Sequence, residues 1–183
     1  MEYFKNQVRS FYNISDRAMD KLLSIFSEKK QKKGSVLIRE GDSNNRIIFL
    51  KEGFSRAYTY ANGKEVTIWF ASNGSPTGAY QGNGSIINVE LLEDSILLIT
   101  TRKKLELLFE KDLELANWGR KIAEYYLNLN IQHFSHYNGL EGKQKYDLLL
   151  KEYPEVFRKA SVKQIASFLN ITPQSLSRIR GKL

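Results

Sequence analysis

The side chains with the clearest chemistry lie near the end of the chain, on one face of a short expected helix. From residue 173 to about residue 182, the outward positions are polar or basic: Gln174, Ser175, Ser177, Arg178 and Lys182. Side chains of these types donate to phosphates and read base edges in the major groove of DNA. We expect Thr172, just before this helix, and Lys163, at the start of the preceding helix, to lie at the same surface.

Two short helices joined by a tight turn are expected to position these side chains. Ser161 and Gln164 have the spacing of a capping box, which begins the first helix. Asn170 ends it, because asparagine tolerates the left-handed conformation that a tight turn needs. Thr172 then caps the second helix, and Pro173 occupies its first position, where a missing N–H costs nothing. The pattern predicts a helix-turn-helix.

The charge of this segment supports an anionic partner. Residues 161–183 contain four basic side chains and no acidic one, within a chain of net charge +8 that has 28 Lys and Arg against 20 Asp and Glu. A basic excess of this kind suits nucleic acid. An ordinary pair of packed helices has little reason to avoid acids, so we predict contact with double-stranded DNA. The alternative is a ligand-binding or interaction module whose C-terminal helices dock a protein partner.

Other chemistries find little support in the residue types present. The chain has no cysteine, which excludes disulfides, thiolate zinc sites and cysteine-held iron–sulfur clusters. His133 and His136 share an expected helix face, but no third metal ligand accompanies them, so no metal site is predicted. No histidine precedes His133, which argues against an enzyme built on a β-roll. We therefore predict that the chain is not an enzyme.

Short β-prone segments separated by turns fill the middle of the chain and predict a sandwich or barrel. They are residues 35–39, 47–51, 55–60, 65–70 and 96–101. Asn62-Gly63 is typical of a two-residue hairpin turn. Residues 72–85 are expected to form a long irregular loop, flanked by Trp69, Phe70 and Tyr80 as a candidate ligand pocket. A roll core without a ligand explains these three side chains equally well.

Helices are expected on both sides of this β region. Residues 1–30 are expected to be helical, and the basic run at 29–33 is interpreted as a solvated helix end. A long helix after residue 111 carries an apolar stripe with alternating spacings of three and four, which is typical of a helix packed on a partner helix. We assign a dimer interface to this stripe, with an intramolecular contact as the alternative: Leu115, Trp118, Ile122, Tyr125 and Leu129.

With these motifs in place, the chain resembles the Crp/Fnr superfamily of bacterial transcription regulators. Residues 163–180, KQIASFLNITPQSLSRIR, are similar to the I-A-x-x-L-G-x-T-x-x-T-L-S-R pattern of that family, with Asn170 in place of the turn glycine. Residues 33–42 and 49–53 resemble the opening strands of a cyclic-nucleotide-binding roll. The resemblance implies an α+β fold: a cyclic-nucleotide-binding-like jelly roll (1–111), a long dimerisation helix (112–138) and a helix-turn-helix domain (139–183).

The same resemblance implies a homodimer that binds a near-palindromic DNA site, with RNA polymerase and an unidentified small-molecule effector as further partners. In this comparison Arg178 is the arginine that contacts phosphate or guanine. The family's cyclic-nucleotide cassette has a glutamate and an arginine, and Ala79 and Ser85 occupy the corresponding positions here. No Lys or Arg occurs between Lys64 and Arg102. Because a buried phosphate without a cation is costly, we predict that cyclic AMP does not bind.

The remaining expectations concern location and the end of the helix-turn-helix. No apolar run approaches the roughly 18 residues that cross a bilayer, and the first ten residues lack the apolar core of a secretory signal. We expect a cytoplasmic protein with no membrane partner. The three residues after Arg180 are too few for the β-hairpin wing of the winged family members, so we expect fewer phosphate contacts than in those members.

Overall fold

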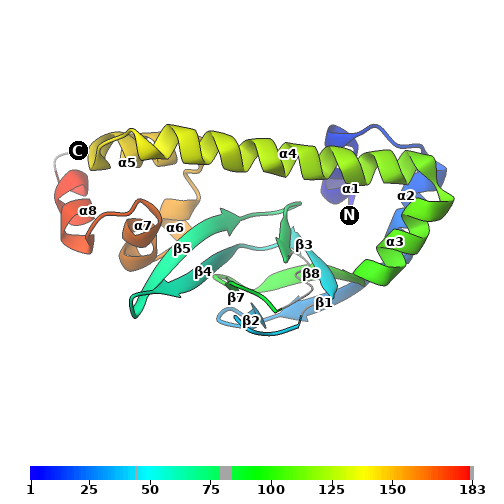
Figure 1. Cartoon of the computed structure of the whole chain (residues 1–183), viewed down its shortest axis with the longest axis horizontal. Coiled ribbons are helices and arrows are strands. Elements are labelled where there is room, and N and C mark those ends of the chain that lie inside the picture. Colours follow the sequence, from blue (N-terminus) through cyan, green and yellow to red (C-terminus); the bar gives the residue numbers. More distant parts are fainter. Residues whose placement is uncertain (44, 79–83, 182–183) are drawn as a thin grey trace.

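The structure, a computed structural model, describes residues 1–43, 45–78 and 84–181. A β-roll lies beneath one long helix, and a cluster of short helices lies at the far end of that helix (Figure 1). The predicted α+β architecture, with a β-roll, a long helix and C-terminal short helices, is confirmed.

Two helices and a strand form the N-terminal region: α1 (Glu2–Phe11), α2 (Asp16–Ser24) and β1 (Ser27–Gln31). The Ser15 hydroxyl caps α2 by accepting the Ala18 N–H. The interpretation of the basic run as a helix end is wrong, because its first part lies in β1 and pairs antiparallel with β8. Strand pairing supplies a long-range partner that overrides the helix preference of lysine.

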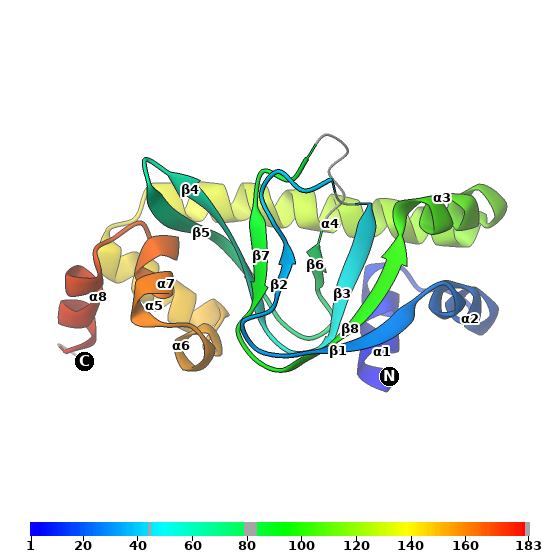
Figure 2. The same ribbon diagram turned by 90° about the horizontal axis from the view of Figure 1, so that it is seen from below.

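The roll consists of two four-stranded antiparallel sheets, with strand orders β1-β8-β3-β6 and β2-β7-β4-β5 (Figure 2). The further strands are β2 (Val36–Ile38), β3 (Arg46–Glu52), β4 (Ser55–Ala61), β5 (Lys64–Ala71), β6 (Pro76–Gly78), β7 (Asn88–Leu91) and β8 (Ser95–Thr101). Their inward side chains, including Ile48, Leu50 and Leu97, form a buried apolar core between the sheets. β6 and β7 were not predicted, and β6 lies inside the segment expected to be an irregular loop.

The β4–β5 hairpin turns at Asn62-Gly63, as predicted. Both residues have positive φ, 51° and 71°, which matches the right-handed twist of the flanking strands. The hairpin extends from the roll toward the C-terminal helices (Figure 2).

After β8, the described residues form six helices. They are α3 (Arg102–Lys111), α4 (Leu113–Asn138), α5 (Gly142–Glu152), α6 (Val156–Lys159), α7 (Val162–Phe168) and α8 (Pro173–Arg180). α4 runs along the molecule from the N-terminal helices to the C-terminal ones (Figure 1). Within the described residues, no helix is both long enough and apolar enough to cross a membrane.

The first half of α4 packs on the protein's own N-terminal helices. Leu115 and Trp118 are almost fully buried in a core with α1 and α2, and the Trp118 indole N–H donates to the Val8 carbonyl at 3.0 Å. Ile122 packs against the same core, and the Tyr125 ring contacts Phe11. The dimer assignment is therefore wrong for Leu115 and Trp118, because the intramolecular alternative accounts for their burial.

Candidate nucleic-acid interface

The helix-turn-helix is formed by α7 and α8, and its capping residues and turn residue lie at the predicted positions. The Ser161 hydroxyl accepts the Gln164 N–H, and the Gln164 side chain accepts the Ser161 N–H. Asn170 has a φ of 54°, the left-handed conformation expected of the turn. The Thr172 hydroxyl accepts the Ser175 N–H, and Pro173 begins α8. These bonds satisfy helix-end N–H groups, so the motif is well capped.

Small and apolar side chains hold the two helices together. Ala166 and Leu176 are completely buried where the helices cross, next to Ile165 and Leu169. This core fixes which face of α8 points outward. The Arg180 guanidinium lies 5.7 Å from the Phe157 ring centroid, so the last turn of α8 also packs on α6.

Most of the predicted DNA-contacting side chains lie together on the outer surface of this motif. Lys163, Thr172, Gln174, Ser177 and Arg178 are exposed. Ser175 is half-buried, and its hydroxyl accepts a hydrogen bond from that of Thr172 at 2.9 Å, so these two side chains also serve the cap. Lys182 lies outside the described residues. An exposed helix face bearing an amide, a hydroxyl and a guanidinium can hydrogen-bond to bases and phosphates.

The helix-turn-helix is docked on the β4–β5 hairpin through Ser167. In β5 one extra residue, Ile68, interrupts the pairing with β4 and forms a bulge. The Ser167 hydroxyl accepts the Thr67 N–H at 2.9 Å and donates to the Glu65 carbonyl at 2.9 Å. One α7 side chain thus satisfies two backbone groups beside the bulge and joins the motif to the roll.

A buried arginine lies directly behind this contact. Arg56 is 3% exposed, and its guanidinium pairs with Glu65 at 2.7 Å and with Glu90 at 2.6 Å. Burial by itself lowers the pKa of Arg56, but the hydrogen bonds to the two carboxylates outweigh it and raise that pKa overall. Glu90 also accepts the side-chain N–H of Gln164 at 3.3 Å. The ion cluster of Arg56, Glu65 and Glu90 therefore reaches α7.

Aromatic rings fill the rest of the space between the roll and the helices. Phe70 stacks on Phe54, with centroids 5.9 Å apart, and contacts Phe168 of α7 at 5.3 Å. Trp69, the preceding residue, packs instead on the core inside the roll. Because successive strand residues point to opposite faces, Trp69 and Phe70 do not line one pocket, and the candidate ligand pocket is wrong for this pair. Tyr80 lies outside the described residues.

His133 belongs to this aromatic layer. Its ring centroid lies 5.5 Å from that of Phe168 and 4.8 Å from that of Tyr137, whereas His136 is exposed. The two histidines therefore point into different surroundings. In the described part of the chain, no group of three His, Cys, Asp or Glu side chains is placed to hold a metal ion.

The burial of His133 predicts that the stability of the folded protein depends on pH. Burial lowers the pKa of its imidazole below the usual 6.5, so the folded protein binds fewer protons there than the unfolded chain. Protonation of His133 therefore does not reduce the free energy of unfolding above about pH 6.5, the pKa of histidine in the unfolded chain. Part of that free energy is lost as the pH falls from there through the lower folded-state pKa. We expect NMR titration of the imidazole C–H signals of His133 to give a midpoint below 6.5. A midpoint at or above 6.5 would contradict the burial of His133.

The roll matches a known protein family, and the overall fold matches several solved structures. Residues 28–112 match the protein family described as "Cyclic nucleotide-binding domain". None of the curated protein sequences matches the chain. Among solved structures, FixK2 from Bradyrhizobium japonicum shares 18% identity over 87% of this chain and 84% of its own, with a TM-score of 0.75.

Two further solved structures show the same similarity. The regulator CLP of Xanthomonas campestris, described as c-di-GMP responsive, is 13% identical over 92% of this chain and 91% of its own, with a TM-score of 0.69. A mutant of CooA from Carboxydothermus hydrogenoformans is 16% identical over 88% of this chain and 77% of its own, with a TM-score of 0.66. The predicted resemblance to Crp/Fnr regulators is confirmed at the level of the fold.

Proposed function

We propose that this chain, which has the fold of the Crp/Fnr-type regulators, is a homodimeric transcription regulator that binds double-stranded DNA in a sequence-specific manner. The observation that carries the proposal is the capped helix-turn-helix with Gln174, Ser177 and Arg178 exposed on its second helix. A recognition helix of this kind reads the major groove through a few side chains. A regulator of this kind would act in the cytoplasm and would have RNA polymerase as a further partner. We propose no enzymatic activity.

The second half of α4 offers a surface for a second copy of the chain. Leu127, Ile131 and Phe134 are 62%, 55% and 74% exposed, and their spacing of four and three places them on one face of the helix. We call this face the α4 stripe. An exposed apolar stripe on a long helix marks an interaction site. A two-fold dimer would pair the stripe with its own copy, and the two recognition helices would then read two half-sites.

We further propose that the roll does not respond to cyclic AMP. Ser85, at the position that the resemblance gives to the phosphate-binding arginine, is 5% exposed, and its hydroxyl donates to the Ile87 carbonyl of its own loop. The nearest basic residues in sequence are Lys64 and Arg102. Ala79, at the position of the ribose-binding glutamate, lies outside the described residues. A cyclic phosphate buried beside Ser85 would have no cation from this segment, which makes binding unfavourable.

The test of DNA recognition is selection from a randomised duplex library, with Arg178→Ala beside the unchanged protein. We expect enrichment of a two-fold symmetric motif. Arg178→Ala should weaken binding to that motif by about 5- to 150-fold per half-site, which corresponds to about 1–3 kcal/mol for one good bidentate contact. Affinity measured against salt concentration should fall steeply if phosphates are neutralised.

Lys151→Ala is the matched control, because Lys151 is an exposed cation on α5 outside the helix-turn-helix. It should leave the selected motif and its affinity nearly unchanged. Sequence-specific recognition by α8 would be refuted if no motif is enriched and if Arg178→Ala and Lys151→Ala reduce a weak binding equally. That result would favour the alternative in which the C-terminal helices dock a protein partner.

A further inference from the structure

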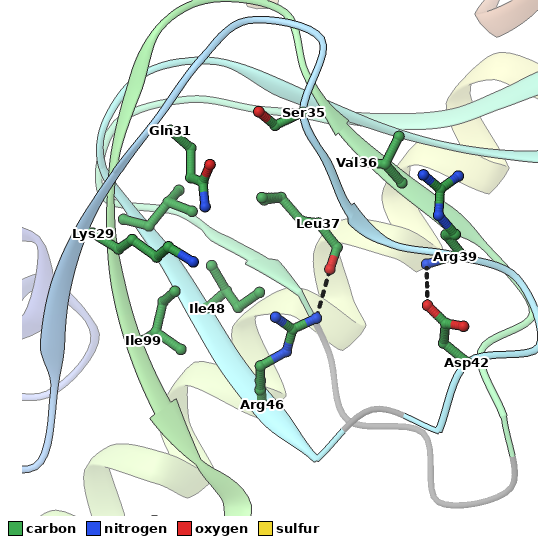
Figure 3. A pocket seen from close by; sticks show the side chains of 11 residues that line it. Lys29, Gln31, Ser35, Val36, Leu37, Arg39, Asp42, Arg46, Ile48 and Ile99 are labelled. Carbon is green, nitrogen blue, oxygen red and sulfur yellow. Dashed lines mark hydrogen bonds between the residues drawn. The ribbon is translucent and has the colours of Figure 1, made fainter.

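A cavity of about 290 Å³ opens into the roll between β1, β2, β3 and β8 (Figure 3). The residues that line it lie between positions 29 and 48 and on β8. They include neither Ala79 nor Ser85, the positions that the resemblance gives to the cassette's glutamate and arginine, although Asp42 at the rim accepts the Ser85 backbone N–H at 2.9 Å. The strands β1, β3 and β8 that line the cavity lie away from the helix-turn-helix (Figure 2).

The mouth of the cavity is cationic. Lys29, Arg39 and Arg46 line it together with one acid, Asp42, whose carboxylate accepts the Arg39 backbone N–H at 3.2 Å. Figure 3 shows the side chains of Lys29 and Arg46 directed toward the same space from β1 and β3. Arg46 donates to the Leu37 carbonyl at 2.7 Å, which holds its guanidinium at the mouth. Three cations against one carboxylate favour an anionic ligand.

Strand pairing explains why Lys29 points into this space. β1 pairs antiparallel with β8, and Lys29 lies opposite Leu97, a residue of the core inside the roll. Its neighbour Glu28 ion-pairs with Lys51 at 2.6 Å. Alternation along the strand places Lys30 on the same face as Glu28 and opposite to that of Lys29. Lys29 is thus the lysine of β1 that the register directs into the roll.

Apolar side chains close the inner end of the cavity. Ile48 and Leu97 lie behind it and are fully buried, whereas Leu37 keeps a little exposed surface and Ile99 is half-buried, so these two can contact a ligand. The amide of Gln31 adds a polar group on the β1 side (Figure 3). Small-molecule sites combine apolar walls with a few convergent polar groups, and the volume of this cavity lies just below their usual range of roughly 300–1,000 Å³, so only a small ligand fits.

We propose that this cavity binds a small organic anion, with its acidic head between Lys29 and Arg46 and a short apolar body against Leu37 and Ile99. Charge-assisted hydrogen bonds to a lysine and an arginine suit a phosphate monoester or a carboxylate. The apolar wall distinguishes such a ligand from an inorganic ion, because the body removes apolar surface from water. The proposal stands independently of DNA binding.

The test measures binding to the full chain by isothermal titration calorimetry and by NMR of the methyl groups of Leu37, Ile48 and Ile99. The probes are hexyl phosphate and hexanoate, with inorganic phosphate and hexanol as the head and body alone. We expect both amphiphilic anions to bind and to shift these methyl signals. Hexanol should not bind measurably, and inorganic phosphate should bind at least about tenfold more weakly than hexyl phosphate, because its complex buries no apolar body.

Two substitutions test the head group, and one controls for net charge. Lys29→Met and Arg46→Gln should each raise the dissociation constant of hexyl phosphate at least about tenfold, since each removes one charge-assisted contact. Lys30→Met removes the same charge from the same strand on its other face and should change the constant less than about twofold, as expected for a screened surface charge. Lys29 is exposed, so its replacement leaves the roll core intact.

Three results would each overturn the proposal. The first is that neither amphiphilic anion binds at 10 mM. The second is that hexyl phosphate and inorganic phosphate bind with equal affinity. The third is that Lys29→Met and Lys30→Met lose equal affinity for hexyl phosphate. The last two would reduce the cavity to a general attraction of anions to a basic surface.

Discussion

Replacing Phe134 with aspartate should convert the proposed dimer into a monomer and lower affinity for a two-half-site DNA by about two to four orders of magnitude. Phe134 is the most exposed member of the α4 stripe, at 74%. In a two-fold dimer it would lie against its own copy, so the substitution would place two carboxylates together in a desolvated contact. Each monomer would then bind one half-site, without the gain in effective concentration that a second linked site provides.

Sedimentation equilibrium measures the dimer, and titration of a full site and of a single half-site measures the two binding modes. The control is Gln132→Asp, which adds the same charge to an exposed position on another face of α4. It should remain dimeric and bind the full site nearly as tightly as the unchanged protein. A Phe134→Asp variant that stays dimeric would show that the α4 stripe is not the interface. A variant that becomes monomeric but keeps its full-site affinity would show that binding does not require the dimer.

The helix-turn-helix could be predicted from the sequence because its determinants are local. Caps at Ser161 and Thr172 act within one helical turn, and Asn170 acts through its own backbone conformation. The Asn62-Gly63 hairpin follows from the same kind of rule. The structure agrees at all of these positions because no distant contact competes with the local preference.

Features that depend on distant partners could not be predicted in this way. The lysine-rich segment at 27–31 becomes a strand because β8 offers it a partner about 70 positions away. The predicted row of apolar residues that begins at Leu115 and Trp118 is a packing face, as its spacing of three and four indicates. That spacing does not show whether the partner is another chain or the protein's own helices. Trp118 shows the second outcome, and the exposed stripe at Leu127, Ile131 and Phe134 lies on a different face.

The contact between the roll and α7 was missed for the same reason. Ser167 has no recognisable spacing relative to Thr67, because the two are 100 positions apart. A weak signal exists for Arg56, which is the one charged residue near the start of a strand of small, hydroxyl and aromatic side chains. An isolated charge in a β-strand of this kind implies a buried partner, since buried charges are paired. The identity of that partner depends on the register of β4 with β5 and β7.

Replacing Arg56 with methionine should lower the free energy of unfolding by about 3–5 kcal/mol, the typical effect of removing one partner from a buried ion pair. The side chains of Glu65 and Glu90 are 25% and 19% exposed, so both carboxylates would keep their charge near each other with little water. Because Glu90 also accepts a hydrogen bond from Gln164, the substitution should loosen α7 from the roll. Urea unfolding followed by tryptophan fluorescence measures the stability.

Hydrogen exchange at the Thr67 amide reports the docking of α7, because that N–H donates to the Ser167 hydroxyl. It should exchange faster in Arg56→Met, and the double variant Arg56→Met/Glu90→Gln should recover part of the stability because one uncompensated carboxylate is removed. Arg120→Met is the matched control: Arg120 pairs with Glu124 on an exposed helix face, and exposed pairs of this kind contribute little to stability. A loss in Arg56→Met no larger than in Arg120→Met would mean that water reaches both carboxylates. The ion cluster would then not hold the helix-turn-helix on the roll.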